Sequence, residues 1–426
     1  MRTTKTIASL STTLAAAGVI AVMASGCTVS GGNPAPSESP GPSSTSSALP
    51  SRSAAAAPSD AAPSPQPTPS ATGVSPPATE DAAARQLSTL SLEKRAGQLF
   101  MVAAKATGPD PGTMEALGKY HVGNVYLSGR SKAGAAATAD VVASLKATVS
   151  PATTGNLPLF VATDQEGGNV QVLSGPGFSA IPSAVAQAGL GPDKLRSSAA
   201  LWGRELRSAG VNVDLAPVLD TVKSAEFAPS NGPIGRFQRQ YGYTPEQVSV
   251  LGNAFAQGLA DAGVAPVVKH YPGLGRVVPN TDVSKDVRDT ETTRTDPALA
   301  PFNTAIRGGA QWVMLSNAYY DRIDPANIAP FSPVVMESML RTDAGFKGII
   351  LSDDMCSAAQ LEPWTSAERA TNFFGAGGTM MVCADPARIP EMHQAVVQKA
   401  QTDPAFRAKV DAAALAVLQV KATAKP

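Results

Sequence analysis

Eight short apolar runs divide most of this chain into repeated units, and no other feature limits its fold as strongly. They are Leu99–Ala103, Gly123–Leu127, Leu159–Thr163, Val211–Ala216, Pro266–His270, Trp312–Ser316, Gly348–Ser352 and Gly378–Cys383. The runs lack polar alternation, which indicates fully buried parallel strands. Eight consecutive strand–helix units predict an α/β fold of the (β/α)8 TIM-type barrel class. A doubly wound sheet is the alternative, but no glycine-rich phosphate-binding fingerprint follows the first run.

The segments between the runs carry helix start and stop signals. Thr244-Pro245-Glu246-Gln247 combines an N-cap residue, a first-turn proline and a capping-box glutamine, and Gly263 is placed to end the helix that starts there. Ser332-Pro333 predicts a second helix start of the same kind. Thr365 with Glu368 predicts a capping box.

The first 26 residues have the organisation of a targeting segment. Arg2 and Lys5 precede a largely apolar stretch over residues 7–23, and Ala24-Ser25-Gly26 leads directly into Cys27. This order resembles a bacterial lipoprotein cleavage box, which implies cleavage before Cys27 and acylation of its thiol. We therefore expect an extracytoplasmic protein that only a lipid anchor attaches to the cell membrane. An ordinary secretory signal with an unrelated cysteine is the alternative.

Residues 27–82 consist mainly of Ser, Pro, Ala, Thr and Gly. Such a composition buries too little apolar surface to offset the entropy of ordering, so we predict a disordered linker. Residues 83–426 lack a second linker and are expected to form one globular domain. One closed barrel needs no partner subunit, so a monomer is expected. The formal net charge is zero and no basic block occurs, which gives no sign of a nucleic-acid partner.

Cysteine and histidine are too rare for a disulfide scaffold or a metal centre. The three cysteines are Cys27, Cys356 and Cys383, and there are three histidines. Cys356 and Cys383 follow or end the seventh and eighth runs. They fit a disulfide in an exported protein and two small buried thiols equally well, because the distance between their Cα atoms decides the matter.

Charged residues follow several of the runs, at the strand ends where barrel enzymes carry their active sites. Asp164 follows the third run, Lys269 and His270 end the fifth, and Asp353 follows the seventh. Such residues are costly next to buried strands unless they are paired or used. This set suits sugar hydrolysis: Asp353 or Asp354 could attack an anomeric carbon, and Asp164, Lys269 and His270 could hydrogen-bond sugar hydroxyls. For Asp164 and Lys269 a structural salt bridge is the alternative.

Several segments resemble glycoside hydrolase family 3, specifically its single-domain β-N-acetylglucosaminidase branch. They are Asp164-Gln165-Glu166-Gly167-Gly168, Asp214-Leu215-Ala216-Pro217-Val218-Leu219-Asp220, Ile234-Gly235 with Arg239-Gln240-Tyr241-Gly242, Lys269-His270-Tyr271-Pro272-Gly273, and Ser352-Asp353-Asp354-Met355. They occur in the family's order and span nearly the whole globular region.

The resemblance implies roles for individual residues. Asp353 would be the nucleophile, while Asp164, Arg239, Lys269 and His270 would hold the sugar. The implied activity is a retaining hydrolysis of β-linked N-acetylglucosamine from peptidoglycan-derived glycans. It implies neither a metal nor an organic cofactor.

The loop over residues 273–284 departs from the family's pattern. Asp282 falls on the aspartate of an acid/base dyad, but Ser284 stands at the histidine position, and Asn169 stands where the family commonly has an arginine. Serine cannot replace imidazole as an acid/base near neutral pH. Asp282 acting directly, Asp286 or Asp289 acting in its place, and slow turnover without an acid are the alternatives.

Two other functions remain compatible with the sequence. Ser284 motivates a non-catalytic or weakly catalytic glycan-binding lipoprotein on the same scaffold. A β-glucosidase, or a phosphorylase in which phosphate replaces water, would keep the nucleophile and change the sugar or the acceptor.

Overall fold

The structure, a computed structural model, describes residues 78–423. The predicted leader, Cys27 and all but the last few residues of the predicted linker lie outside the described residues. The first helix, α1 (Ala78–Ser88), begins a few residues before the predicted domain boundary at residue 83. No helix in residues 78–423 has the length and apolarity needed to cross a membrane.

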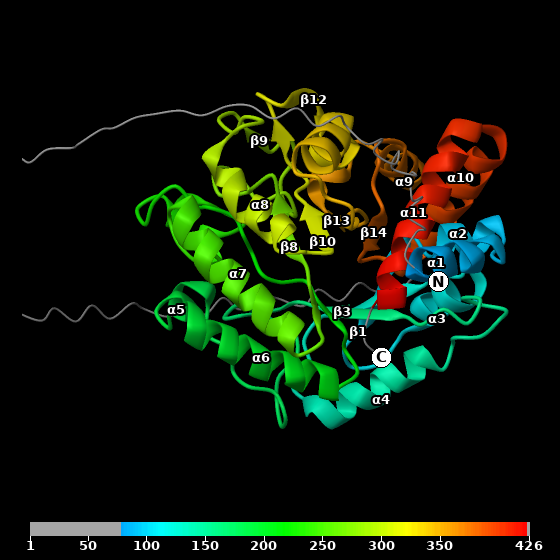
Figure 1. The fold of residues 1–426 in the computed structure, drawn as a ribbon, viewed down its shortest axis with the longest axis horizontal. Helices are drawn as coiled ribbons and strands as arrows, with labels where there is room; N and C mark the ends of the chain where they lie inside the picture. Colours follow the sequence, from blue (N-terminus) through cyan, green and yellow to red (C-terminus); the bar gives the residue numbers. More distant parts are fainter. Residues whose placement is uncertain (1–77, 424–426) are drawn as a thin grey trace, which may run out of the picture. The chain divides into compact units, whose positions relative to one another are not determined.

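Parallel strands form the centre of the fold, and the predicted barrel is confirmed (Figure 1). The strands are β1 (Phe100–Lys105), β2 (Asn124–Ser128), β3 (Phe160–Thr163), β6 (Val213–Asp214), β7 (Ala265–Pro266), β8 (Val268–Tyr271), β10 (Trp312–Leu315), β13 (Ile349–Asp354) and β14 (Met380–Cys383). Each predicted apolar run contains or overlaps at least one of them, and the fifth run overlaps both β7 and β8. Their nearly continuous burial explains why they read as apolar runs without alternation.

The sheet nearly closes on itself. Its order is β7-β6-β3-β2-β1-β14-β13-β10-β8, and the two edge strands are consecutive segments of one chain stretch, separated by Val267. The N–H of Val267 donates to the carbonyls of Asp214 and Ala216, and a bridge joins Val218 to Lys269. The β7–β8 stretch therefore completes the circle that eight strand–helix units predict.

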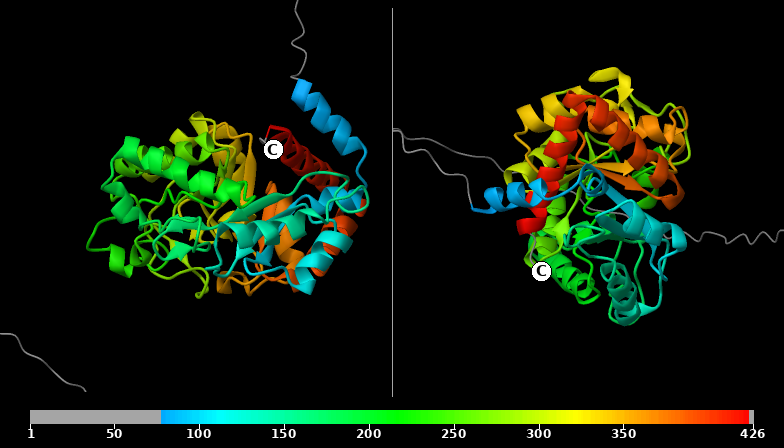
Figure 2. Two further views of the ribbon diagram at one scale, coloured as in Figure 1. Left: turned by 90° about the horizontal axis from the view of Figure 1, so that it is seen from below. Right: turned by 90° about the vertical axis from the view of Figure 1, so that its right-hand side faces the viewer.

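Helices surround the strands (Figures 1 and 2). They are α2 (Leu92–Gly97), α3 (Pro111–Lys119), α4 (Gly134–Lys146), α5 (Ala184–Ala188), α6 (Pro192–Ser208), α7 (Pro245–Asp261), α8 (Ala300–Arg307), the π-helix η5 (Val334–Asp343), α9 (Ser366–Gly375), α10 (Ile389–Thr402) and α11 (Pro404–Thr423). Short 3-10 helices are η1 (Ala228–Ser230), η2 (Gly235–Phe237), η3 (Pro297–Leu299), η4 (Ala329–Phe331), η6 (Ala359–Leu361) and η7 (Pro386–Arg388). Short strands outside the barrel are β4 (Gln165–Gly167), β5 (Val170–Gln171), β9 (Arg288–Asp289), β11 (Tyr319–Tyr320) and β12 (Asp324–Ile328).

The predicted helix signals are present as hydrogen bonds. The Thr244 side chain accepts from the Gln247 N–H at the start of α7. Thr365 and Glu368 form a complete capping box at the start of α9. The Ser332 side chain accepts from the Val335 N–H, but the helix that follows is a π-helix rather than an α-helix.

Two aromatic side chains meet at the amino-terminal ends of the barrel strands. The rings of Phe160, at the start of β3, and Trp312, at the start of β10, meet edge to face with centroids 4.8 Å apart. The Lys421 ammonium of α11 lies 5.2 Å from the Phe160 ring and donates to Gln98 Oε1 and the Gly123 carbonyl. We call Phe160, Trp312 and Lys421 the barrel floor.

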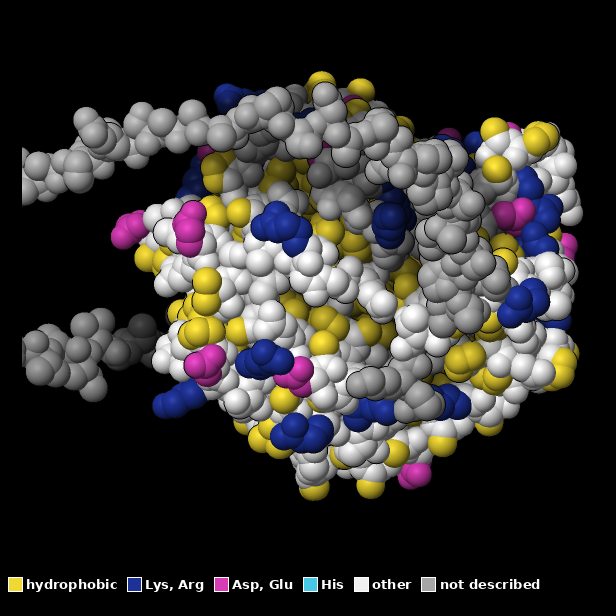
Figure 3. Space-filling model, viewed as in Figure 1, with side chains coloured by type: hydrophobic (Ala, Val, Ile, Leu, Met, Phe, Trp, Pro, Cys, Tyr) yellow, Lys and Arg dark blue, Asp and Glu magenta, His cyan; other side chains and the backbone are white. Residues whose placement is uncertain are grey.

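The first and last helices of the described chain are held together by a small apolar cluster. Ala83 of α1, Leu90, Leu157 and Leu418 of α11 are all buried in it. On the face shown in Figure 3, acidic and basic side chains are scattered among one another.

Cys356 and Cys383 form a disulfide, with Cα atoms 5.0 Å apart. This resolves the two alternatives that the sequence left open. The bridge joins the chain just after β13 to the end of β14, which are neighbouring strands in the sheet.

Candidate active site

The six residues predicted for the site line one cavity of about 560 Å³. They are Asp164, Arg239, Lys269, His270, Asp282 and Asp353. They come from the ends of β3, β8 and β13 and from two loops. Asp164 and Asp353 lie far apart in the sequence, yet both line this cavity. This convergence at the carboxyl ends of the strands is what barrel geometry requires of an active site.

Asp353 lies near the end of β13, partly buried in the cavity wall. Its Oδ1 accepts a hydrogen bond from the N–H of Asp354 at 2.8 Å. Burial raises the pKa of Asp353 to about 6, and the charge of Asp282 adds to the rise, while His270 and the Asp354 N–H oppose it. Asp353 is therefore largely ionised at neutral pH, as a carboxylate nucleophile must be.

Glu166 connects two cations of the cavity. Arg239 donates to both carboxylate oxygens of Glu166, at 2.8 and 2.7 Å, and the Lys269 ammonium lies 2.6 Å from one of them. Lys269 also donates to Asp164 at 2.7 Å. Burial would raise the pKa of Glu166, but the charges of Arg239 and Lys269 outweigh it and hold this pKa at about 2. The four side chains thus form one fixed network of ions.

His270 is held by a second buried carboxylate. Its Nδ1 lies 2.7 Å from Asp220 Oδ2, and Asp220 Oδ1 accepts from the Leu274 N–H at 2.6 Å. A proton on Nδ1 satisfies this contact and leaves Nε2, 3.5 Å from an Arg239 nitrogen, on the other side of the ring. The peptide bonds before His270 and before Pro272 are both cis.

Asp282 lies on the long loop between β8 and β9, with an exposed side chain. The Ala359 N–H donates to the Asp282 carbonyl at 3.0 Å, and the Gln360 N–H donates to the Thr281 carbonyl at 3.1 Å. Both donors follow β13, so the segment that carries Asp282 is attached to the segment that follows Asp353.

The other two aspartates of this loop have different environments. Asp286 accepts from Arg288 at 2.6 Å and is largely exposed, while buried Asp289 accepts from the Thr292 hydroxyl and from two backbone N–H groups. Of the three, only Asp282 is among the residues that line the cavity. His121 and His393 bind the carbonyls of Thr153 and Glu93 and do not line it.

Asp214 is a buried carboxyl close to the network. Its Oδ1 accepts from the Gln165 N–H at 3.0 Å, just after Asp164, and its Oδ2 has no hydrogen-bond partner. Burial raises the pKa of Asp214 to about 8, so this group is mostly neutral at pH 7.

Several cavity residues and supporting residues escape prediction from the sequence. Tyr126, Arg130 and Phe237 line the cavity, and Glu166 and Asp220 hold the residues that do. Glu166 and Asp220 carry a usable signal, because both stand within charged segments that follow buried strands. Tyr126 sits inside an apolar run, Arg130 on a loop and Phe237 on the short 3-10 helix η2, where sequence alone assigns no direction to a side chain.

Ser316, which ends the sixth run, and Asn317, which follows it, support the site from outside the cavity. The Ser316 hydroxyl pairs with the Tyr320 hydroxyl, which donates to the Gly273 carbonyl, and Asn317 donates to the Asp354 carbonyl at 3.1 Å. Within residues 78–423, no group of three or more His, Cys, Asp or Glu side chains is arranged to hold a metal ion.

Curated relatives cover a large part of this chain. A β-hexosaminidase of Xanthomonas oryzae pv. oryzae is 34% identical over 248 residues, which are 56% of this chain and 71% of the relative. A β-hexosaminidase of Nitrosomonas eutropha is 32% identical over 280 residues, or 64% of this chain and 76% of the relative.

A solved structure is more similar still. The crystal structure of a β-N-acetylhexosaminidase from Beutenbergia cavernae has 49% sequence identity and a TM-score of 0.77, and the match covers 78% of this chain and 98% of that one. The glycosyl hydrolase family 3 N-terminal domain matches residues 91–420, almost the entire described chain. With its barrel and its carboxylate-lined cavity, this chain belongs to glycosyl hydrolase family 3 and is a glycoside hydrolase.

Proposed function

We propose that the protein is a retaining β-N-acetylhexosaminidase that releases β-linked N-acetylglucosamine from peptidoglycan-derived glycans. The observation that carries the proposal is the convergence of Asp353 and Asp282 on the cavity that the Lys269, Arg239 and Glu166 network borders. The names of relatives that are 32–49% identical support the choice of sugar.

In this mechanism the Asp353 carboxylate attacks the anomeric carbon and the bond to the leaving oxygen breaks. Asp282 gives its proton to that oxygen, and a covalent glycosyl-enzyme forms on Asp353. Water then attacks the same carbon, Asp282 takes up a proton from the water, and Asp353 is released as a carboxylate. Two inversions leave the β configuration unchanged.

The ion network gives the sugar a rigid binding surface. Lys269 and Asp164 supply a donor and an acceptor for hydroxyl groups, and His270 and Arg239 supply further polar atoms from the same wall. Because Glu166 and Asp220 already fix three of these groups, little side-chain entropy is lost when the sugar binds.

Asp282 takes the acid/base role in the absence of a histidine at position 284. It interacts electrostatically with Asp353 and lines the same cavity, whereas Asp286 and Asp289 are engaged elsewhere. General acid/base catalysis contributes about 10²–10⁴-fold to rate. A variant without the Asp282 carboxylate should therefore lose that part of the rate.

The test compares aryl N-acetyl-β-glucosaminides with good and poor leaving groups. Asp353→Ala should abolish turnover of both, because the first bond can no longer form. Asp282→Asn should slow the poor leaving group by about 10²–10⁴-fold and the good one far less. Asp286→Asn is the matched control and should behave like the wild type.

Three results would contradict the proposal. Full activity of Asp353→Ala would show that Asp353 is not the nucleophile. An equal effect of Asp282→Asn on both substrates would show that Asp282 is not the general acid. Acceleration of the wild type by inorganic phosphate, with a sugar phosphate as product, would identify a phosphorylase instead.

We also propose that the protein is exported and held at the cell membrane by lipid on Cys27. The basic residues, apolar stretch and small residues before Cys27 support this. Fatty-acid labelling of the full chain in a bacterial host should mark the wild type and leave Cys27→Ala unlabelled. Equal labelling of both would refute the anchor.

A further inference from the structure

Asp354 binds the nucleophile with its backbone and two loops with its side chain. Its N–H donates to Asp353 Oδ1 at 2.8 Å. Its Oδ1 accepts from the N–H groups of Cys356, at 3.0 Å, and Ala384, at 2.8 Å, and its Oδ2 accepts from the N–H of Ser357, at 2.9 Å. One carboxylate therefore joins the loop after β13 to the loop after β14.

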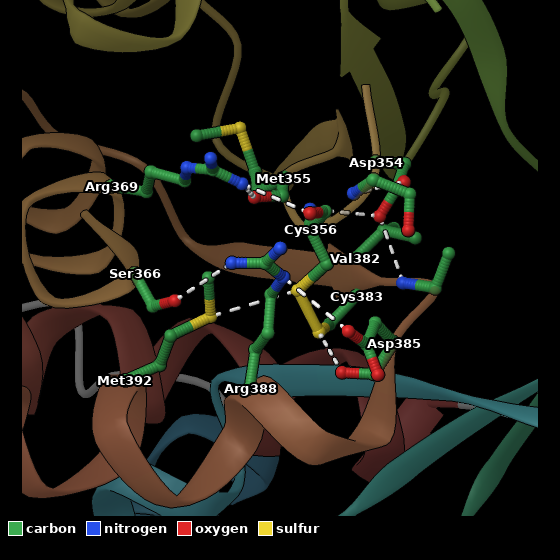
Figure 4. The surroundings of a disulfide bond; sticks show 12 residues. Asp354, Met355, Cys356, Ser366, Arg369, Val382, Cys383, Asp385, Arg388 and Met392 are labelled. Atoms are coloured by element: carbon green, nitrogen blue, oxygen red, sulfur yellow. Dashed lines mark hydrogen bonds and ion pairs between the residues drawn. A yellow bond between two sulfur atoms is a disulfide. The ribbon is translucent and has the colours of Figure 1, made fainter. Parts of the chain in front are cut away.

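The disulfide lies beside the same contacts (Figure 4). Cys356 is itself one of the three donors, and Cys383 directly precedes the donor Ala384. Both cysteines are at most 1% exposed. The covalent bond thus limits how far the two loops can separate at the position where Asp354 needs both of them.

A third element holds the loop from its other side. Arg369 of α9 is buried and donates to the carbonyls of Met355, at 3.0 Å, and Cys356, at 2.9 Å. Its direction in Figure 4 is toward the backbone next to Asp354. The carbonyls and the N–H groups of this short segment are therefore both occupied.

The regular sheet does not provide this support at Asp353. The register between β13 and β14 shifts between Leu351 and Asp354, so the ladder is irregular where the nucleophile stands. Placement of a reacting group matters steeply, since an error of about 1 Å can cost on the order of 10²-fold in rate. At this irregular point, the side-chain contacts of Asp354 and the disulfide add to the pairing of Asp354 with Val382.

We propose that Asp354 and the Cys356–Cys383 disulfide act together as a positioning clamp that sets the location of Asp353. The clamp, as we name Asp354, Cys356 and Cys383, acts on the catalytic step; Asp354 also lines the cavity, whereas the two cysteines do not. The sugar-binding residues come from β3, β8 and the loop after η2, outside the clamp. This inference rests on the proposed role of Asp353 as nucleophile.

Two variants test the clamp in the full-length protein. Cys356→Ala with Cys383→Ala removes the covalent link, and Asp354→Asn keeps the side-chain volume and one acceptor oxygen but removes the charge. In both, kcat on an aryl N-acetyl-β-glucosaminide should fall on the order of 10–100-fold. In the cysteine variant, whose altered residues do not line the cavity, the dissociation constant for free N-acetylglucosamine, measured by calorimetry, should stay within about twofold.

The pH profile gives a readout that loss of stability alone would not change. The Asp354 N–H favours the ionised form of Asp353, so loss of that bond raises the pKa of Asp353. The cysteine variant keeps the charge of Asp354 and loosens the segment that carries this N–H, so in that variant the acid limb of kcat/KM should move to higher pH.

Arg341 offers a matched control at the opposite end of the same two strands. It donates to the Gly348 carbonyl, just before β13, and to the Thr379 hydroxyl, just before β14. Arg341→Met should lower the melting temperature with kcat and the acid limb unchanged. If folded Asp354→Asn keeps the wild-type kcat, or if Arg341→Met loses kcat to the same extent, the clamp is wrong.

The outcome of Asp353→Ala separates this inference from the proposed function. An inactive Asp353→Ala beside a fully active Asp354→Asn would refute the clamp but keep Asp353 as the nucleophile. A fully active Asp353→Ala would refute both the clamp and the proposed nucleophile.

Discussion

At the scale of single residues, the negative charge of Glu166 offsets the positive charges of Lys269 and Arg239 in the cavity wall. It is 5% exposed and bonds two cations, while one of them, Lys269, also bonds Asp164. A buried cation without such a partner costs several kcal/mol, on the order of 3–5 when one member of a pair is removed. Glu166 thus lets Lys269 and Arg239 line the cavity while they stay charged.

The raised pKa of Asp353 predicts an acid limit for activity. Asp353, the proposed nucleophile, must be ionised to attack, and its pKa lies at about 6 because of burial and the nearby charge of Asp282. Activity should therefore fall as the pH drops through 6, which a profile of kcat/KM for the wild type measures.

Asp282→Asn should move this limit in a known direction. It removes a negative charge that raises the pKa of Asp353, so the acid limb should shift to lower pH. A dinitrophenyl glycoside keeps the variant active enough to measure, because its leaving group needs no acid. An unchanged or upward-shifted limb would mean that the two carboxylates do not interact.

The residues of the site differ in how visible they are in the sequence. Asp164, Lys269, His270 and Asp353 stand out because charge directly after a buried strand is costly and needs a reason. Arg239 and Asp282 lie on loops, and a family resemblance was needed to single them out. Phe237, on a short 3-10 helix, carries no sequence signal of its own.

At the scale of elements, apolar runs predict the strands well because parallel strands are buried on both faces. The bounds are less accurate where tertiary contacts intervene. The fourth run predicts Val211–Ala216, but the ladder covers only Val213–Asp214, since Pro217 follows closely and has no N–H to donate. The fifth run divides at Val267, whose N–H bonds back to the preceding strand.

Helix starts are predictable and helix types less so. The Thr365 capping box depends on neighbours three residues apart, which a sequence displays directly. Ser332-Pro333 likewise marks the start of a helix, but the wider hydrogen-bond pattern of η5 is not encoded in such a local signal. The Cys356–Cys383 disulfide could not be predicted from a local signal either, because it depends on which strands become neighbours in the sheet.

At the scale of the whole molecule, Lys421 links stability to pH. Burial lowers the pKa of Lys421 to about 7, and within the described residues its ammonium bonds only neutral groups, Gln98 and the Gly123 carbonyl. The folded pKa lies below the unfolded value of about 10.4. The unfolded chain therefore binds more protons between these values, and stability rises as the pH increases from 7 toward 10.

Lys421→Met should remove this dependence. The melting temperature of the wild type, minus that of the variant, should increase between pH 7 and pH 10 in calorimetric scans. Exposed Lys399 of α10 provides the control, and Lys399→Met should differ from the wild type by a constant amount. A constant difference for Lys421→Met as well would show that the buried amine does not titrate in this range.

The barrel places Phe160, Trp312 and Lys421 at the amino-terminal ends of its strands and the candidate active-site cavity at their carboxyl ends. In the proposed mechanism, the leaving alcohol must vacate the space in this cavity from which water attacks the glycosyl-enzyme. A second sugar bound in that space would compete with water. We therefore expect transglycosylation products, with new glycosidic bonds, at high glycan concentrations.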